Sequence, residues 1–379
     1  MCNLLYNMYM KKNFPINIKV LGSGTCLPPF VVNNVDLEDF YPKGPFPQFG
    51  SPFDWSAKWI DEKLGVTERR FAYDLKNKKM RDGYYDLDMS EKAARAALDD
   101  AGMKIEDIST IIYISSTPEY FMPDPACALH LRLGASNDTS AFGLTSVGCG
   151  GFVYGMINAS SLIESGTAER VLIVASNSTS AYMAQYEDPN LNEEQLNGLK
   201  IRDRLNASMF GDGASAMILG GAEEGSSENI QSYYWGADGS NNPVIFEAGG
   251  SRNPTTIETI KKGKHFFNMD GRLVKDVAPG LFEKTIRTVL GHANLQLTDI
   301  DFFVFHQVNT RLLKMMAEKM QIPWDKIEVH VDHYGNLDTA TLGIAYDEAK
   351  KAGKFKSGDK VLFAAVGAGW QFGGVIMNI

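Results

Sequence analysis

The sequence predicts an α/β fold in which one layout of strands and helices occurs twice. Apolar strand-like segments alternate with helical runs, and the order of these segments repeats in the second half of the chain. Each half also contains a glycine-rich corner where a strand passes into a helix. We therefore expect two halves, residues 1–222 and 223–379, packed with helices between and outside two sheets. Because strands and helices alternate, we expect mostly parallel strand pairing.

The first half supplies its expected elements in a clear order. A strand over 18–21 ends in a glycine turn, and a helix over 90–102 has Ser90 as its N-cap and Gly102 as its stop. The elements that follow are an apolar strand within 105–116, a helix that opens at 124–125, the corner around Cys149 with a helix over 152–164, a strand over 171–176 and a segment over 210–219.

The second half repeats this order. Its expected elements are a helix over 273–293, an apolar strand within 297–306, a helix over 310–320, a strand that leads into the corner 334–336, a helix over 339–351, a strand over 360–365 and a glycine-rich hairpin over 367–377. Asp107 precedes Cys149 by nearly as many residues as Asp299 precedes Asn336. Cys149 and Asn336 therefore occupy equivalent corners, and packing of the halves would bring both to one central cleft.

Composition excludes several classes of function. Of the 379 residues, 44% are hydrophobic and 22% are charged, as in ordinary soluble globular proteins. The net charge of -9 gives no electrostatic footprint for nucleic acid or an anionic membrane, and no apolar run is long enough to span a bilayer. The four cysteines have no CxxC spacing and share no metal-ligand spacing with the six histidines. We therefore expect no metal site, no disulfide framework and a reduced, cytoplasmic setting.

Cys149 is the candidate nucleophile. It lies in the corner 145–152, where an apolar segment runs through small residues into a helix-like run. Unpaired backbone N–H groups and the positive end of the dipole at a helix N-terminus favour the thiolate, and the flanking glycines would let a thioester approach the sulfur. The alternative is that Cys149 is a small buried residue in a glycine-rich packing corner.

His306 is the second candidate, because it ends the apolar strand 302–305 at the point where the chain turns toward a helix. Taken alone, a histidine in this position is more often a hydrogen-bonded structural residue. Taken with Cys149 and Asn336 at matching corners, it predicts a shared active site.

At this point the chain resembles a known family, the thiolase-fold condensing enzymes, and among them β-ketoacyl-acyl carrier protein synthase III. The resemblance runs from about residue 16 to the C-terminus. The motifs that carry it, in order, are the Cys149 corner, 210–214, 305–309, 334–336 and the final glycine-rich hairpin. It implies a thiolase-like fold with five αβαβα layers, a homodimer, and thioesters of coenzyme A or phosphopantetheine as substrates without any other cofactor.

The resemblance also implies a two-stage reaction. Cys149 would take an acyl group from acyl-CoA or an acyl-carrier protein, and the backbone N–H groups of Cys149 and Ala368 would stabilise the oxyanion. The family usually has glycine where this chain has Ala368, although the N–H group remains. A malonyl-type thioester would then lose carbon dioxide, with His306 Nε2 and the Asn336 amide stabilising the enolate that attacks the acyl group.

Further positions match substrate-binding residues of the family. Trp59 and Arg204 match residues that sandwich the adenine of coenzyme A, and Arg272 matches a polar contact to the pantetheine arm. Lys63 replaces a third expected cation, an arginine, and lacks its planar stacking surface.

Three more matches concern partners. Arg311 and Lys319 match the face that grips an acidic carrier protein, although a solvated helix surface would give the same pattern. Met122 occupies the position that reaches into the acyl pocket of the partner subunit, where a flexible thioether would allow a longer or branched chain. The polar, acidic segment 185–200 is longer than in the shorter bacterial enzymes and indicates either a specialised pathway or a surface insertion.

Three alternatives stay open at this stage. The first is a relative from specialised metabolism that joins two acyl or β-ketoacyl chains, of the resorcinol, quinolone or long-chain ketone type. The second is acyl transfer to an oxygen or nitrogen nucleophile, and the third is a catalytically silent subunit of a heterodimer. The presence of both His306 and Asn336 disfavours the last two, because neither needs a pair that stabilises an enolate.

Overall fold

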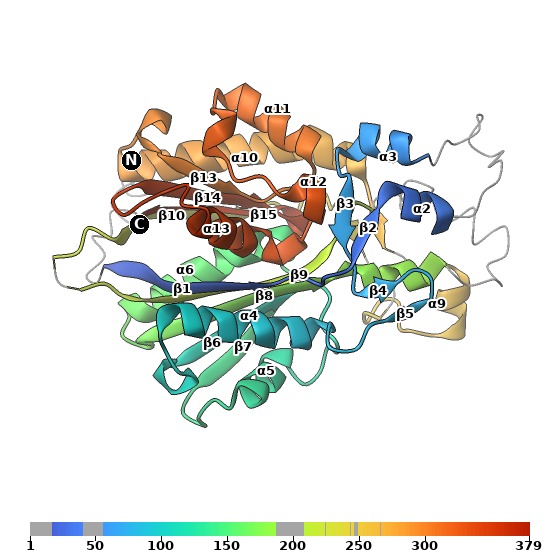
Figure 1. Cartoon of the computed structure of the whole chain (residues 1–379), viewed down its shortest axis with the longest axis horizontal. Coiled ribbons are helices and arrows are strands. Elements are labelled where there is room, and N and C mark those ends of the chain that lie inside the picture. Colours follow the sequence, from blue (N-terminus) through green and yellow to red (C-terminus); the bar gives the residue numbers. More distant parts are fainter. Residues whose placement is uncertain are drawn as a thin grey trace.

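The computed structural model describes residues 17–40, 56–186, 208–223, 225–242, 244–245, 249–265 and 267–379. Its sheets and helices stack in five layers, with one helical layer between two sheets and one on each outer face (Figure 1). This confirms the duplicated, thiolase-like α/β fold. The helices of these layers are α4 (Asp86–Ala101) and α5 (Pro125–Leu133) outside the first sheet, α6 (Gly151–Glu164) and α13 (Thr341–Lys351) in the centre, and α10 (Gly271–Ala293) and α11 (Thr310–Met320) outside the second sheet.

The first sheet is built from residues before 222. Its strands, in spatial order, are β1 (Ile18–Cys26), β9 (Asp212–Gly221), β8 (Arg170–Ser178), β6 (Thr110–Ser115) and β7 (Ser140–Thr145). Strand β6 runs parallel to both β7 and β8, because α5 and α6 each return the chain to the same end of the sheet. Strand β9 is antiparallel to both of its neighbours.

The second sheet is built from residues after 228, so the predicted boundary at 222/223 falls between β9 and the first strand of this sheet. Its strands, in spatial order, are β10 (Asn229–Ala237), β15 (Gln371–Asn378), β14 (Lys360–Val366) and β13 (Phe302–Phe305). Strands β13 and β14 are parallel, whereas β15 is antiparallel to both neighbours. The prediction of mostly parallel pairing is therefore wrong, because the last strand of each half, β9 or β15, runs antiparallel to both of its neighbours.

Several shorter elements gather at one end of the sheets, on the right of Figure 1. They enclose an apolar cluster of their own, to which Val32, Leu37, Ile60 and Phe71 contribute buried side chains. These elements are β2 (Val31–Asn33), α2 (Asn34–Phe40), α3 (Ala57–Leu64), β3 (Glu68–Arg70), β4 (Tyr73–Asp74), β5 (Lys79–Met80), β11 (Val244–Ile245), α9 (Ile257–Lys261) and β12 (Asn268–Met269).

Two further expectations about local structure are wrong. Ser90 lies inside α4 rather than at its N-cap, which is Tyr85, and its hydroxyl donates to the carbonyl of Asp86. The strand expected before Tyr334 is replaced by the short helix α12 (Val331–Tyr334), and a single parallel bridge between Phe303 and Ile327 is what remains of strand pairing there.

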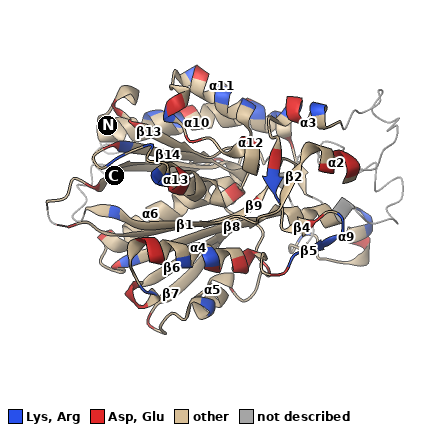
Figure 2. Ribbon diagram, viewed as in Figure 1, with Lys and Arg blue, Asp and Glu red and all other residues tan. Residues whose placement is uncertain are grey.

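Charged residues are dispersed over the outer elements. Figure 2 shows acidic and basic residues interspersed along the outer helices and along α13 of the central layer, whereas the strands of the two sheets are largely free of them. No helix among the described residues combines the length and apolarity needed to cross a membrane.

Candidate active site

Cys149 lies where β7 gives way to the central helix α6. After β7, Ser146 and Gly148 adopt positive φ angles of 62° and 63°, and a single 3₁₀ turn, η3 (Gly148–Gly150), leads into the helix at Gly151. Helix α6 is buried between the two sheets. The thiol therefore lies at a helix N-terminus, as the sequence predicted, and in the middle of the molecule.

The glycines of this corner permit a close approach by the hairpin between β14 and β15. A Cβ atom on Gly367 would lie 2.5 Å from the amide nitrogen of Gly150 and 2.9 Å from that of Cys149. A Cβ atom on Gly148 would lie 3.2 Å from the amide nitrogen of Ala368. The hairpin backbone therefore packs directly on the backbone of the nucleophile.

A cavity of about 310 Å³ opens beside the thiol. Its polar side is formed by residues from both halves of the chain, including Ser116, Cys149, Asn336, Asp338 and Ala368. Its remaining wall is mostly apolar and includes Tyr182, Met209, Phe210, Phe267, Met269, Val274, Ala278 and Val308. Cys149, Asn336 and Ala368, which the sequence placed in one site, thus share one cavity.

Asn336 is held by its backbone and by one end of its side chain. Its N–H donates to the carbonyl of Met209 at 2.9 Å, and its carbonyl accepts from the N–H of Gly211 at 3.0 Å. The side-chain Oδ1 accepts from the N–H of Asp338 at 2.8 Å. The amide oxygen is therefore occupied, and Nδ2 is the end left for the thiol or for a bound molecule.

His306 follows the last residue of β13 and is 2% exposed. Its N–H donates to the carbonyl of Ala364 on β14, and neither ring nitrogen has a hydrogen-bond partner among the described residues. Burial lowers the pKa of His306 to about 3, so the ring is neutral and carries one N–H donor at physiological pH. His306 is not among the residues that line the 310 Å³ cavity, but Val366 and Gly367, which continue the neighbouring strand β14, are.

The ionisation of Cys149 differs from the expectation for a thiol at a helix N-terminus. Burial, followed by the carboxylate of Asp338, raises the pKa of Cys149 well above its ordinary value of 9.0. The backbone N–H of Cys149 and the amide of Asn336 act in the opposite direction but do not outweigh these effects. The thiol is therefore protonated at neutral pH in the free protein.

Asp338 is a site residue that sequence reasoning missed. It is 5% exposed and lines the same cavity as Cys149 and Ser116. Burial raises its pKa above the ordinary value of 3.8. The available signal was an acidic residue two positions after Asn336 in a run of apolar and small residues.

A second cavity of about 380 Å³ adjoins the first, because Met209, Met269, Val274 and Val308 line both. Two of the predicted cations, Lys63 and Arg311, line it. So does Lys275 in the second turn of α10, which the sequence analysis did not single out.

Two predicted coenzyme A contacts lie elsewhere. Trp59 is half-buried on α3 and packs against the apolar cluster of Val32 and Leu37, and Arg272 is exposed in the first turn of α10. Neither residue lines the described part of the two cavities. Arg204 and the segment 187–200 lie outside the described residues. These assignments stay predictions.

The two predicted carrier-protein contacts on α11 differ in their surroundings. Arg311 is exposed at the second cavity. Lys319 forms an ion pair with Glu283 of α10, with 2.8 Å between Nζ and Oε2. Lys319 is therefore already engaged in a contact between two helices.

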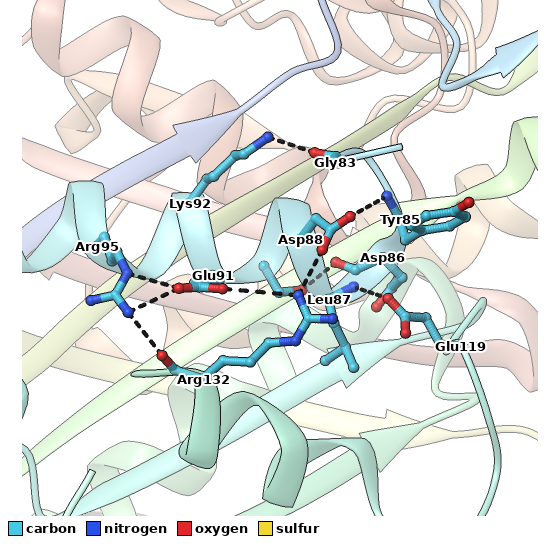
Figure 3. Close-up of polar contacts among 11 residues, drawn as sticks. Gly83, Tyr85, Asp86, Leu87, Asp88, Glu91, Lys92, Arg95, Glu119 and Arg132 are labelled. Atoms are coloured by element: carbon cyan, nitrogen blue, oxygen red, sulfur yellow. Dashed lines mark hydrogen bonds and ion pairs between the residues drawn. The ribbon is translucent and has the colours of Figure 1, made fainter. Parts of the chain in front are cut away.

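Met122 lies on the segment between β6 and α5 and is 89% exposed, beside Phe121 at 85%. It does not line the cavity of its own chain among the described residues. Polar contacts fix this segment to α4: Glu119 Oε1 accepts from the N–H of Leu87 at 3.0 Å, and Arg132 of α5 pairs with Asp88 of α4 at 2.6 Å (Figure 3). Two large apolar side chains are thus held outward on a well-tethered surface.

The described residues contain no group of three or more His, Cys, Asp or Glu side chains placed to hold a metal ion. The cysteines among them, Cys26, Cys127 and Cys149, are free.

Comparison with known proteins identifies relatives over almost the whole chain. Residues 145–239 match the family model described as 3-oxoacyl-[acyl-carrier-protein (ACP)] synthase III, and residues 290–379 match the model for its C-terminal part. The β-ketoacyl-[acyl-carrier-protein] synthase III of Caldanaerobacter subterraneus is 33% identical over 92% of this chain and 94% of its own length. The crystal structure of the corresponding enzyme of Aquifex aeolicus is 28% identical, with a TM-score of 0.76 over 96% of this chain and 100% of its own. OleA of Xanthomonas campestris, at 20% identity and a TM-score of 0.78 over 96% of this chain and 98% of its own, shares the fold.

Proposed function

Because the chain belongs to the β-ketoacyl-[acyl-carrier-protein] synthase III family of condensing acyltransferases, we propose that it acylates Cys149 and then condenses that acyl group with a malonyl-type thioester. The observation that carries this proposal is that Cys149 from one half and Asn336 from the other line one cavity, which Ala368 of the second half also lines. A single packing corner would not need polar side chains from both halves.

In the first stage, the Cys149 sulfur attacks the carbonyl carbon of an acyl thioester, and the donor thiol leaves. The oxyanion binds to the N–H groups of Cys149 and Ala368. The close contact of the hairpin with the Cys149 corner supports this role, because it fixes the two N–H groups before the substrate arrives.

In the second stage, the malonyl-type thioester loses carbon dioxide, and its carbon attacks the acyl-Cys149 carbonyl. A neutral His306 can donate from one ring nitrogen to the enolate oxygen, and Asn336 can donate from Nδ2. Support comes from the unpartnered ring nitrogens of His306 and from the occupied Oδ1 of Asn336. A charged histidine is not required, since a neutral donor in a dry site stabilises the enolate without an opposing ion.

The donor reaches the thiol through the second cavity, whose cations Lys63, Lys275 and Arg311 suit the phosphates of coenzyme A or an acidic carrier protein. The apolar wall of the first cavity suits the acyl chain. The exposed Phe121 and Met122 support a homodimer in which the partner covers them. We further propose a cytoplasmic setting, consistent with the free cysteines of the described residues.

Intact-protein mass spectrometry tests the first stage with a panel of acyl-CoA and acyl-carrier thioesters. At least one donor should add its acyl mass to the wild type and not to Cys149→Ala. Malonyl-CoA or malonyl carrier protein should then discharge the adduct with release of carbon dioxide. Discharge by a second acyl thioester without carbon dioxide would instead indicate an enzyme that joins two acyl chains, and no adduct with any donor would refute the proposal.

A further inference from the structure

We infer that Asp338 is a catalytic residue of the acylation step, which accepts the proton of the Cys149 thiol and passes it to the departing thiol of the donor. The inference rests on the proposed function of Cys149. The oxyanion N–H groups and the Asn336 Nδ2 group are donors and cannot accept that proton. His306 is a weak base, because burial lowers its pKa to about 3, and it is not among the residues that line the Cys149 cavity.

The geometry brings the carboxylate to the thiol. Asp338 opens the 3₁₀ turn η7 (Asp338–Ala340) that leads into α13, and its N–H is fixed on Asn336 Oδ1 at 2.8 Å. It has a φ of +46°, a conformation that costs a residue other than glycine about 1 kcal/mol and persists where the surrounding contacts impose it. Both Asp338 and Cys149 line the same cavity, and the turns that carry them, η7 and η3, pack against each other.

The environment of the pair favours proton exchange between the two groups. Burial raises the pKa of each group, and the Asp338 charge raises the pKa of Cys149 further, so the carboxyl group loses its proton at a lower pH than the thiol does. The other groups that face Asp338 are the hydroxyl of Ser116 and the phenol of Tyr182, whose pKa burial raises. Lysine and arginine are missing from the described residues that line this cavity, so no cation neutralises the carboxylate.

The proton balance of the step closes with these groups alone. Asp338 takes the proton from Sγ as the sulfur forms its bond to the acyl carbon. When the tetrahedral intermediate collapses and the bond to the donor sulfur breaks, the protonated Asp338 gives the same proton to the departing thiolate. The products are acyl-Cys149, the donor thiol and an ionised Asp338. After condensation, the Cys149 thiolate takes a proton from solvent.

The test compares single-turnover acylation of the wild type, Asp338→Asn and Asp347→Asn by rapid quench and intact mass, with the best acyl donor of the wild type. Asp347 is a matched control, because it is equally buried in α13 but pairs with Ser23 and Lys351. Asp338→Asn should acylate about 10²-fold or more slowly at neutral pH. At the same time, the pH midpoint of Cys149 alkylation by iodoacetamide should fall, since the charge that raised the thiol pKa is gone. Asp347→Asn should change neither value.

Structural damage would not make acylation slower and at the same time lower the pH midpoint of Cys149 alkylation. Asp338→Asn acylation at or above the wild-type rate would overturn the inference, as would an unchanged alkylation midpoint.

If Asp338→Asn does not fold, the dependence of the wild-type acylation rate on pH provides the test. If Asp338 acts as the base, the acylation rate should be constant with pH until Asp338 becomes protonated at acid pH, and it should fall below that point. If the acylation rate instead changes tenfold per pH unit over the whole range, the attacking group is the free thiolate and Asp338 is not involved. Failure of every donor to acylate the wild type would refute the proposed function itself, whereas acylation with no role for Asp338 would refute this inference alone.

Discussion

The two corners of the molecule use the same backbone device for different chemistry. In the first half, positive φ angles at Ser146 and Gly148 lead through the turn η3 into α6. In the second half, positive φ angles at Gly335 and Asp338 lead through the turn η7 into α13. The first corner presents a thiol, and the second presents an amide and a carboxylate. Duplication therefore supplies two equivalent positions around one cavity, and side-chain substitution divides the work between them.

The comparison also shows that the second corner controls the first. A helix N-terminus is expected to lower the pKa of Cys149, yet burial and Asp338 raise it. Asn336 opposes this effect and at the same time fixes the backbone of Asp338. The pKa of Cys149 thus depends first on burial, and in addition on residues that lie almost two hundred positions away in the sequence.

The largest effect is expected from Cys149→Ala, which removes the contribution of the first corner. The acyl adduct should vanish, and condensation should fall by roughly 10⁴-fold or more, because no second thiol lines the described cavity. Intact mass and product formation measure the two effects. Residual condensation at wild-type rate would mean that Cys149 only packs.

Next in size is Asn336→Ala, which removes the donor of the second corner. Condensation of pre-acylated enzyme should fall by about 10²- to 10³-fold, while Cys149 still accepts an acyl group. Carbon dioxide release after addition of malonyl thioester measures the second step separately from the first. His306→Ala should show the same division, and equal losses in both steps would contradict the separate roles of the corners.

Gly367→Ala is expected to push the hairpin away from the Cys149 corner, with a smaller effect on activity than the preceding variants. Its methyl group would lie 2.5 Å from the Gly150 nitrogen, so the hairpin must shift away from the Cys149 corner. We expect a loss of about 1–3 kcal/mol in the free energy of unfolding and slower acylation. Gly239→Ala is the control, since its added methyl group meets no atom within 4 Å. Chemical denaturation and acylation rates measure both, and equal behaviour of the two variants would remove the role assigned to this contact.

The smallest expected effect concerns His330, which is buried near His306 and lies 3.9 Å from Glu348. Burial lowers its pKa to about 3, so the ring is neutral and this separation is not an ion pair. The unfolded chain binds the proton near pH 6.5 and the folded chain does not, so stability is lost as pH falls below that value. When the pH falls from 6 to 4.5, the free energy of unfolding of His330→Leu should decrease by about 2 kcal/mol less than that of the wild type. Urea unfolding at both pH values measures this difference, and equal losses would mean that His330 is protonated in the folded state.

Sequence patterns predicted much of this architecture, because spacing and periodicity carry it. Helix α11 begins and ends where the pattern placed it, at Thr310 and Met320, and the repeat placed Cys149 and Asn336 at equivalent corners. Strand direction was not predictable from alternation, since nothing local distinguishes the hairpin return of β15 from a crossover. Burial depth is equally invisible in the sequence, so the raised pKa of Cys149 and the role of Asp338 emerged from the structure.

The most direct test of the shared site follows the Cys149 peptide of the wild type by mass spectrometry, first with an acyl thioester and then with isotopically labelled malonyl thioester. The account predicts an acyl mass on that peptide, followed by its loss together with one labelled carbon dioxide and one β-ketoacyl product per site. An acyl group located on another residue, or loss of the adduct without carbon dioxide or condensed product, would contradict it.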